Sequence, residues 1–204
     1  VGESPKKYLP LPPSALFEYL SQSHNDKLNN LEDAFKNVEI EDKFTDFWHL
    51  HGYRNIMLKM KELINNANKK IIISGWKREF SECKKELMSA KRRGVRCTIF
   101  SFTEVDEKLG KIVSYKLDED ELRKIWTPKI IMVVDHSHTL MGSAQSVEQS
   151  KAILTQNKAI SEIAMNHIIL DITLAGQRLG FDSAEYVKDI MRNPAEDLQS
   201  LLRS

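Results

Sequence analysis

Apolar and polar positions along this chain follow two periods, which predict strands and helices in alternation. Short runs rich in β-branched residues predict strands over residues 44–50, 71–76, 95–102, 130–134, 139–141 and 152–155. Apolar residues spaced three and four apart predict helices over 14–38, 53–68, 79–93, 160–179 and 183–202, the last broken near Pro194. Strands that alternate with helices predict an α/β fold.

Two of the predicted strands lack the alternation of apolar and polar residues that a strand with one solvent-exposed face shows. Residues 71–73 and 130–134 are continuous apolar runs, which are typical of strands covered by helices on both faces of a sheet. Residues 103–127 follow a weaker pattern, with a candidate strand at 112–115 and a solvated acidic run at 118–121. We therefore expect 103–127 to be mainly a loop that closes over a ligand cleft.

The N-terminal residues predict a linker followed by a helix. Three prolines among residues 10–13 favour an extended path, so residues 1–13 are expected to be a linker. Residues 14–43 are expected to hold a dimerisation helix, in which Leu28, Leu31, Phe35 and Val38 form a short coiled-coil seam. Packing of that helix on its own domain is an equal alternative. The α/β domain is expected over 44–180 and a C-terminal helix over 181–204.

Composition excludes several classes of protein. Thirty basic residues nearly balance 29 acidic ones, so the chain lacks the basic footprint of a nucleic-acid-binding domain. Cys83 and Cys97 form no CxxC pair, so neither a zinc site nor a disulfide framework is expected. No apolar run approaches the roughly 20 residues of a membrane span. We expect a cytoplasmic protein with no membrane partner.

The stretch from Trp126 to Gln145 resembles the signature region of the phospholipase D superfamily. It contains a buried strand, the turn residue Asp135, a second strand and Gly142-Ser143, with Gln145 where the family usually has Asn. In that family a His and a Lys on the first strand perform phosphoryl transfer. Their positions fall here on Pro128 and Ile130, which can neither attack nor bind phosphate. The resemblance implies a phospholipase-D-like αβα sandwich without its reaction: no enzyme and no cofactor.

Five stretches together resemble a narrower family, the TrmB-type transcriptional regulators, whose C-terminal half is a phospholipase-D-like sensor domain. They are residues 4–13, 51–56, 92–97, 133–135 and 152–157. The resemblance implies a homodimer that senses a small effector, such as a sugar or another polar metabolite. It also implies that DNA is bound only through a winged-helix domain absent from this chain. The family's larger sugar sensors carry a further β-rich domain, whereas this chain ends in a helix.

The expected ligand cleft lies where the strands ending at residues 76, 102 and 135 converge, because parallel neighbours end on one side of a sheet. The residues expected to line it are Trp76, Thr103, Asp135, Ser143 and Gln145. Asp135 has an alternative interpretation as an ordinary turn residue, with Ser143 and Gln145 holding that turn. Trp76 and Trp126 are expected at the rim or in the core.

Two histidine pairs, His49 with His51 and His136 with His138, suggest metal ligation only weakly, since no carboxylate or cysteine completes a coordination set. We predict no metal site.

Four functions remain open on the sequence: the sensing and dimerisation part of a regulator, a degenerate association module without a ligand, an active phosphodiesterase and a metal-binding protein. The last two have the least support.

Overall fold

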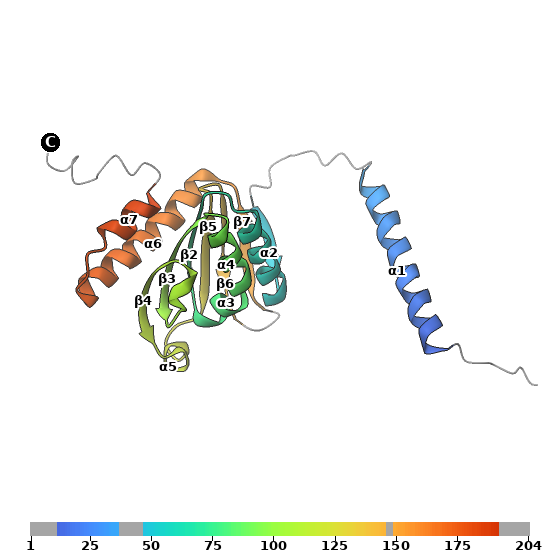
Figure 1. The fold of residues 1–204 in the computed structure, drawn as a ribbon, viewed down its shortest axis with the longest axis horizontal. Helices are drawn as coiled ribbons and strands as arrows, with labels where there is room; N and C mark the ends of the chain where they lie inside the picture. Colours follow the sequence, from blue (N-terminus) through green and yellow to red (C-terminus); the bar gives the residue numbers. More distant parts are fainter. Residues whose placement is uncertain (1–11, 37–46, 146–148, 192–204) are drawn as a thin grey trace, which may run out of the picture. The chain divides into compact units, whose positions relative to one another are not determined.

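The computed structural model of this chain describes residues 12–36, 47–145 and 149–191, and Figure 1 shows its elements in chain order. By its contacts the chain divides into two compact units, residues 1–44 and 45–204. Four predicted features lie outside the described residues: the linker up to residue 11, the seam residue Val38, the strand start at 44–46 and the helix end beyond 191.

The described residues of the first unit form the helix α1 (Pro13–Lys36), which confirms the predicted helix over this part. Its side chains are largely exposed, including the large apolar residues Leu16, Phe17, Tyr19, Leu20, Leu28 and Leu31. A helix normally draws most of its stability from burying an apolar face. No contact within α1 itself therefore covers these apolar residues.

The second unit is built on a seven-stranded sheet in the order β1-β7-β6-β5-β2-β3-β4. Its strands are β1 (Phe47–His51), β2 (Lys70–Gly75), β3 (Arg96–Thr103), β4 (Lys111–Leu117), β5 (Lys129–Val134), β6 (His138–Ser143) and β7 (Lys151–Thr155). Strands β2, β3 and β4 run parallel, and every other neighbouring pair is antiparallel. The expectation that the strands ending near residues 76, 102 and 135 are all parallel is wrong for β5.

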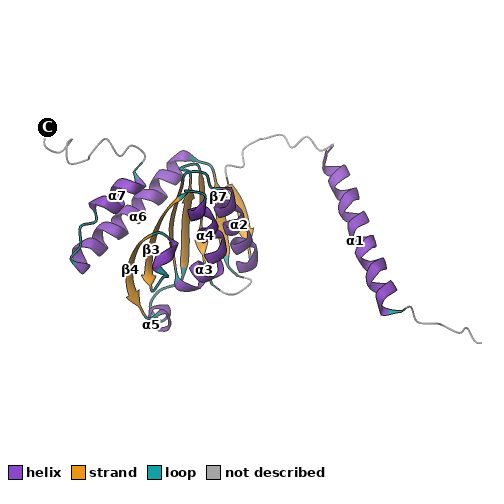
Figure 2. Ribbon diagram, viewed as in Figure 1, coloured by secondary structure: helices purple, strands orange, loops and turns teal. Residues whose placement is uncertain are grey.

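Helices cover both faces of this sheet and give three layers, as the resemblance implied (Figure 2). One face carries α2 (Tyr53–Asn66), α3 (Lys77–Glu82) and α4 (Lys84–Arg92), and the other carries α6 (Lys158–Leu179) and α7 (Ala184–Ile190). Strand β2 shows how the sequence builds both cores. Ile71 and Ile73 enter the core under α2 and α4, while Ile72 enters the core under α6. The prediction of a strand buried on both faces is confirmed.

The helix predicted over 79–93 is two helices, because the chain bends at Cys83 with φ −95° and ψ 7°. Its predicted end at Gly94 is confirmed. Gly94 has φ +86°, and the N–H of Val95 donates to the carbonyl of Ala90 at 3.1 Å. This geometry closes the last turn of α4 and directs the chain into β3.

Residues 103–127 do not form the expected loop over a cleft. They contain a 3-10 turn (Glu107–Leu109), the edge strand β4 and the short helix α5 (Glu119–Arg123). Asp118 caps α5 by accepting the N–H groups of Asp120 and Glu121. The acidic run thus starts a helix, and β4 confirms the candidate strand at 112–115. The prediction that 103–127 is mainly a loop is wrong.

Helix α6 is long and apolar enough to cross a membrane by length and composition, and it alone has this property among the described residues. Its inner side packs on the sheet, where Ala164, Ile168, Ile172 and Ala175 are buried. A core helix of a globular domain has the same composition, so this property is weak evidence of a membrane span.

Candidate functional site

Trp76 and Thr103 lie together at the carboxyl ends of β2 and β3, as predicted. The Thr103 hydroxyl accepts the backbone N–H of Lys77 at 2.8 Å and lies 3.2 Å from the hydroxyl of Ser101. Both Trp76 and Thr103 are buried. Thr103 therefore holds the start of α3 against β3, and its hydroxyl is already used.

Ser143 and Gln145 lie at the same edge of the sheet, because β6 and β2 are both antiparallel to β5. The hydroxyl of Ser143 accepts the N–H of Lys151 at 3.1 Å, and the carbonyl of Gln145 accepts the hydroxyl of Ser150. These contacts join β6 to β7. The alternative interpretation, in which these two residues hold the turn at Asp135, is wrong.

Asp135 lies at the opposite edge of the sheet, so the predicted convergence of the five residues is wrong for it. Asp135 and His136, with φ 52° and 57°, are the central residues of the tight turn between β5 and β6, in which the Ser137 N–H donates to the Val134 carbonyl at 3.1 Å. The antiparallel direction of β5 decides this placement, since β5 ends where β2 begins.

The carboxylate of Asp135 binds the backbone at the start of β2. It accepts the N–H groups of Asn68 at 2.9 Å and of Lys69 and Lys70 at 2.8 Å each. Partial burial raises the pKa of this carboxyl, but the three N–H donors outweigh it and hold the pKa below its usual value. Asp135 therefore fixes the pairing of β2 with β5 and has little capacity left for a ligand.

The two positions that carry the phospholipase D chemistry are filled by packing. Pro128 and Ile130 are both buried, and the carbonyl of Pro128 accepts the N–H of Ala144 at 2.9 Å. Beside them, Nη2 of Arg78 donates to the carbonyl of Ala144 and to Glu79 Oε1. The distance from Nη2 to Glu79 Oε1 is 2.8 Å. The ion pair between Arg78 and Glu79 therefore lies beside Pro128, the position at which the resemblance expected a nucleophilic His.

Tyr53 completes this ion-pair network. Its hydroxyl oxygen lies 2.9 Å from Glu82 Oε1 and 3.2 Å from Glu79 Oε1, so two carboxylates share one donated proton, and Arg78 lies 4.2 Å above its ring. Burial, followed by the charge of Glu79, raises the pKa of Tyr53, while burial outweighs Arg78 and raises the pKa of Glu79. This network was not predicted from the sequence, although the adjacent charges Arg78-Glu79 soon after an apolar strand are a usable signal.

A cavity of about 630 Å³ opens at the Asp135 edge of the sheet, between α2 and strands β1, β6 and β7. Its volume falls in the range of roughly 300–1,000 Å³ typical of small-molecule sites. The lining mixes aromatic, apolar and polar groups: Trp48, His49, Leu50, Lys59, Glu62, Leu63, Asn66, Asn68, Val134, Asp135, Ser137, His138, Leu154 and Gln156. We call it the Asp135-edge cavity.

The polar groups of this cavity can serve a hydrogen-bonding ligand. His138 lies 2.9 Å from the Ser137 hydroxyl and 3.0 Å from the Gln156 side-chain nitrogen, and Lys59 pairs with Glu62 at 2.8 Å. Trp48 is 47% exposed and offers an open aromatic face. The combination suits a small polar molecule that also has a face able to stack on an indole.

The four histidines of the two predicted pairs do not form one cluster. His138 and His49 line the Asp135-edge cavity, whereas His136 contacts the sulfur of Met165 on α6 at 2.9 Å. Within the described residues no three His, Cys, Asp or Glu side chains are placed to hold a metal ion.

A smaller hollow of about 150 Å³ lies at the opposite edge, on the α6 side of the sheet. Trp126 borders it, is 51% exposed and lies 4.9 Å from the ring of Phe102, while Trp76 forms its inner wall. Trp126 therefore lies at the rim of this hollow, and Trp76 lies in the core; the cleft whose rim they were expected to form does not assemble.

Three solved structures are similar to this chain at low sequence identity. TrmBL2, an archaeal chromatin protein, is 15% identical, with 81% of this chain and 72% of that chain covered and a TM-score of 0.47. Nuc from Salmonella typhimurium, a phospholipase D family member, is 15% identical, with 61% and 93% covered and a TM-score of 0.46. NucT from Helicobacter pylori is 10% identical, with 62% and 96% covered and a TM-score of 0.45.

Sequence comparison finds a relative and a family. The uncharacterized protein YrhO of Bacillus subtilis (strain 168) is 22% identical over 174 residues, which are 85% of this chain and 63% of the relative's length. The family model for the transcriptional regulator TrmB, N-terminal subdomain of the effector-binding domain (EBD), matches residues 46–170. That match covers most of the α/β unit, and the chain therefore belongs to the TrmB family of transcriptional regulators.

Proposed function

We propose that this chain is the effector-sensing and dimerisation portion of a TrmB-type regulator and that its effector binds in the Asp135-edge cavity. The observation that carries the proposal is a ligand-sized cavity of about 630 Å³ within the segment matched to an effector-binding subdomain. The effector is a small polar metabolite, because hydrogen-bonding side chains and one open indole face line the cavity.

The proposed portion performs no phosphodiester chemistry. Buried Pro128 and Ile130 supply neither a nucleophile nor a phosphate-binding cation. The single proton of the nearby Tyr53 hydroxyl is shared between Glu79 and Glu82, and the raised pKa of Tyr53 disfavours the phenolate that an attack would require. The network therefore favours a structural role for this region.

Transcription would be regulated because effector binding changes the dimer and, through it, DNA binding by the whole regulator. The chain spans 63% of the length of its relative YrhO, so DNA contact by the whole regulator is part of the proposal, as is a cytoplasmic location. The chain has a formal net charge of only +1, which agrees with DNA being bound by another domain.

The test is a thermal-shift screen of the full chain against sugars, sugar phosphates, nucleotides and amino acids. An effector at one hundred times its Kd stabilises the fold by about 2.7 kcal/mol. The shift should be lost in Trp48→Ala and Gln156→Ala, which alter the cavity, and kept in the matched control Trp126→Ala at the other edge of the sheet. A screen in which every observed shift is unchanged in both cavity variants contradicts the site. A screen with no hit favours the ligand-free association module.

A further inference from the structure

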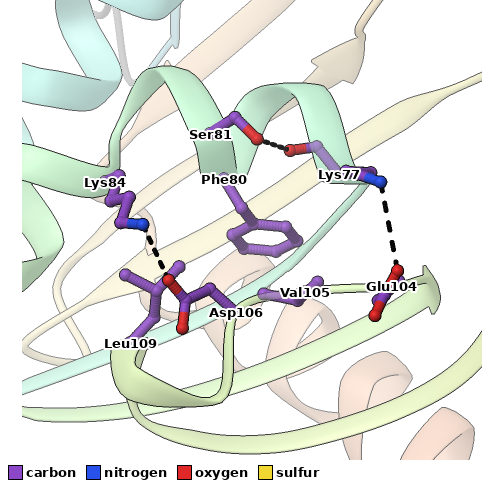
Figure 3. Close-up of a pocket in the computed structure, with 8 residues that line it drawn as sticks. All are labelled: Lys77, Phe80, Ser81, Lys84, Glu104, Val105, Asp106 and Leu109. Carbon is purple, nitrogen blue, oxygen red and sulfur yellow. Dashed lines mark hydrogen bonds and ion pairs between the residues drawn. The ribbon is translucent and has the colours of Figure 1, made fainter.

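A second hollow, of about 260 Å³, lies between the α3–α4 segment and the loop that follows β3 (Figure 3). Its floor is apolar and consists of Phe80, Val105 and Leu109, which are buried. It is at the carboxyl edge of the parallel strands β2 and β3, the usual place for ligands in open α/β sheets. The Asp135-edge cavity lies at the opposite edge.

Charged side chains of opposite sign face each other across this hollow. Lys77 and Lys84 come from the helical wall, and Glu104 and Asp106 come from the loop wall. Lys84 Nζ lies 2.8 Å from Asp106 Oδ2, and Lys77 Nζ lies 4.0 Å from Glu104 Oε2. One wall is therefore cationic, the other is anionic, and the four charges sum to zero.

These ion pairs differ from several others on the surface. Lys59–Glu62, Arg123–Glu119 and Lys124–Glu121 each join residues three or four apart along one helix. The pairs at the hollow join two separate elements above an apolar floor. Exposed ion pairs contribute only about 0–1 kcal/mol to stability, so a ligand that offers better partners can replace them at small cost.

We propose that this hollow binds a zwitterionic ligand with an apolar side chain, namely a neutral apolar α-amino acid. The ligand carboxylate would form ion pairs with Lys77 and Lys84, and the ligand ammonium would form ion pairs with Glu104 and Asp106. Its side chain would cover Phe80 and Leu109. Each ionic group of the ligand meets the opposite charge, and each broken ion pair is replaced by a charge-assisted hydrogen bond of the same type.

Simple anions and simple cations fit less well. A ligand with only a carboxylate would pair with the two lysines but leave Glu104 and Asp106 without a cation. A ligand with only an amine would pair with the two carboxylates but leave the lysines without an anion. The matched set of charges therefore selects for a ligand that carries both. The apolar floor adds a preference for leucine over glycine, because about 25 cal/mol is gained for each Å² of apolar surface buried.

The test uses L-leucine, 4-methylpentanoate and 3-methylbutylamine as probes, since the last two keep the apolar chain but lose one charge. Calorimetric titration of the full chain should detect L-leucine and find each single-charge analogue at least tenfold weaker, with glycine also weaker. Lys84→Met and Asp106→Asn should each weaken leucine binding about tenfold, as expected when about 1.4 kcal/mol of interaction is lost. Both variants should fold, because Met keeps the apolar stem and Asn caps a helix turn as Asp does.

The matched control is Lys85→Met, which removes the charge of an exposed neighbour that does not line the hollow. It should bind leucine as the wild type does. Absence of leucine binding at millimolar concentration, equal binding of 4-methylpentanoate, or unchanged binding in both variants would each overturn the proposal. The effector test is separate, because a ligand of the Asp135-edge cavity responds to Trp48→Ala and not to Lys84→Met.

Discussion

Asp135 and Lys70 are joined by two reciprocal hydrogen bonds across the β2–β5 pair. The N–H of Lys70 donates to Asp135 Oδ1 at 2.8 Å, and the N–H of Asp135 donates to the carbonyl of Lys70 at 2.9 Å. One aspartate thus fixes where β2 begins relative to where β5 ends. Because a shift of one residue would exchange the two faces of a strand, this contact protects the burial of Ile71, Ile72 and Ile73.

Asp135→Ala should destabilise the domain by about 2–4 kcal/mol, because three backbone donors lose an ionised acceptor and alanine is strained at φ 52°. Asp135→Asn should cost less, since asparagine keeps one oxygen and tolerates this backbone region. Urea unfolding followed by circular dichroism measures both. Asp120→Asn, an exposed carboxylate on α5, is the control, and a loss no larger than the control's would contradict the assigned role.

The same carboxylate predicts a pH dependence. The pKa of Asp135 is lowered in the folded chain, so its contribution is complete above the unfolded pKa of about 3.9. It is lost as pH falls further, through the folded pKa. Between about pH 5 and pH 2 the urea midpoint of the wild type should therefore fall more steeply than that of Asp135→Asn. Parallel curves would show that another group governs acid unfolding.

The sequence predicted the layers of this domain better than its edges. Continuous apolar runs such as 130–134 identify buried strands, because a strand covered on both faces carries mainly apolar residues. Strand direction is not encoded in such a run. The reversal of β5 relative to β2 depends on long-range pairing, and it moved Asp135 away from Trp76. The network of Tyr53 and Glu79 was missed because residues 26 apart meet only after α2 and α3 pack.

Gly142 of the Gly-Ser pair allows β6 and β7 to approach closely. A Cβ at this position would meet the carbonyl oxygen of Lys151 and would lie 2.5 Å from Cα of Ala152, both of which are backbone atoms. Gly142→Ala should destabilise the domain by about 1–3 kcal/mol through this overpacking, measured by urea unfolding. Ser143→Ala is the matched neighbour and should cost less, and equal losses would point to the strand pair rather than to the glycine.

Purified protein should not hydrolyse bis-p-nitrophenyl phosphate, because the positions of the nucleophile and of the phosphate-binding cation hold Pro128 and Ile130. Release of p-nitrophenol, followed by absorbance, measures this. Activity that survives in a Pro128→Ala, Asp135→Ala double variant would identify a contaminant. Activity that disappears in Asp135→Ala, while the variant remains folded by circular dichroism, would contradict the absence of catalysis.

Helix α1 should hold two copies of the chain together. Leu28 and Leu31 lie three apart on one side of the helix and are 48% and 53% exposed, so a second copy of α1 can bury both in a symmetric contact. Light scattering at high micromolar concentration should give the mass of a dimer. Leu31→Glu should yield a monomer, because it would bury a charge at the seam, whereas the adjacent exposed control Asn29→Glu should remain dimeric. A monomeric wild type would contradict the dimer, and a dimer that persists in Leu31→Glu would assign the contact to the α/β unit instead.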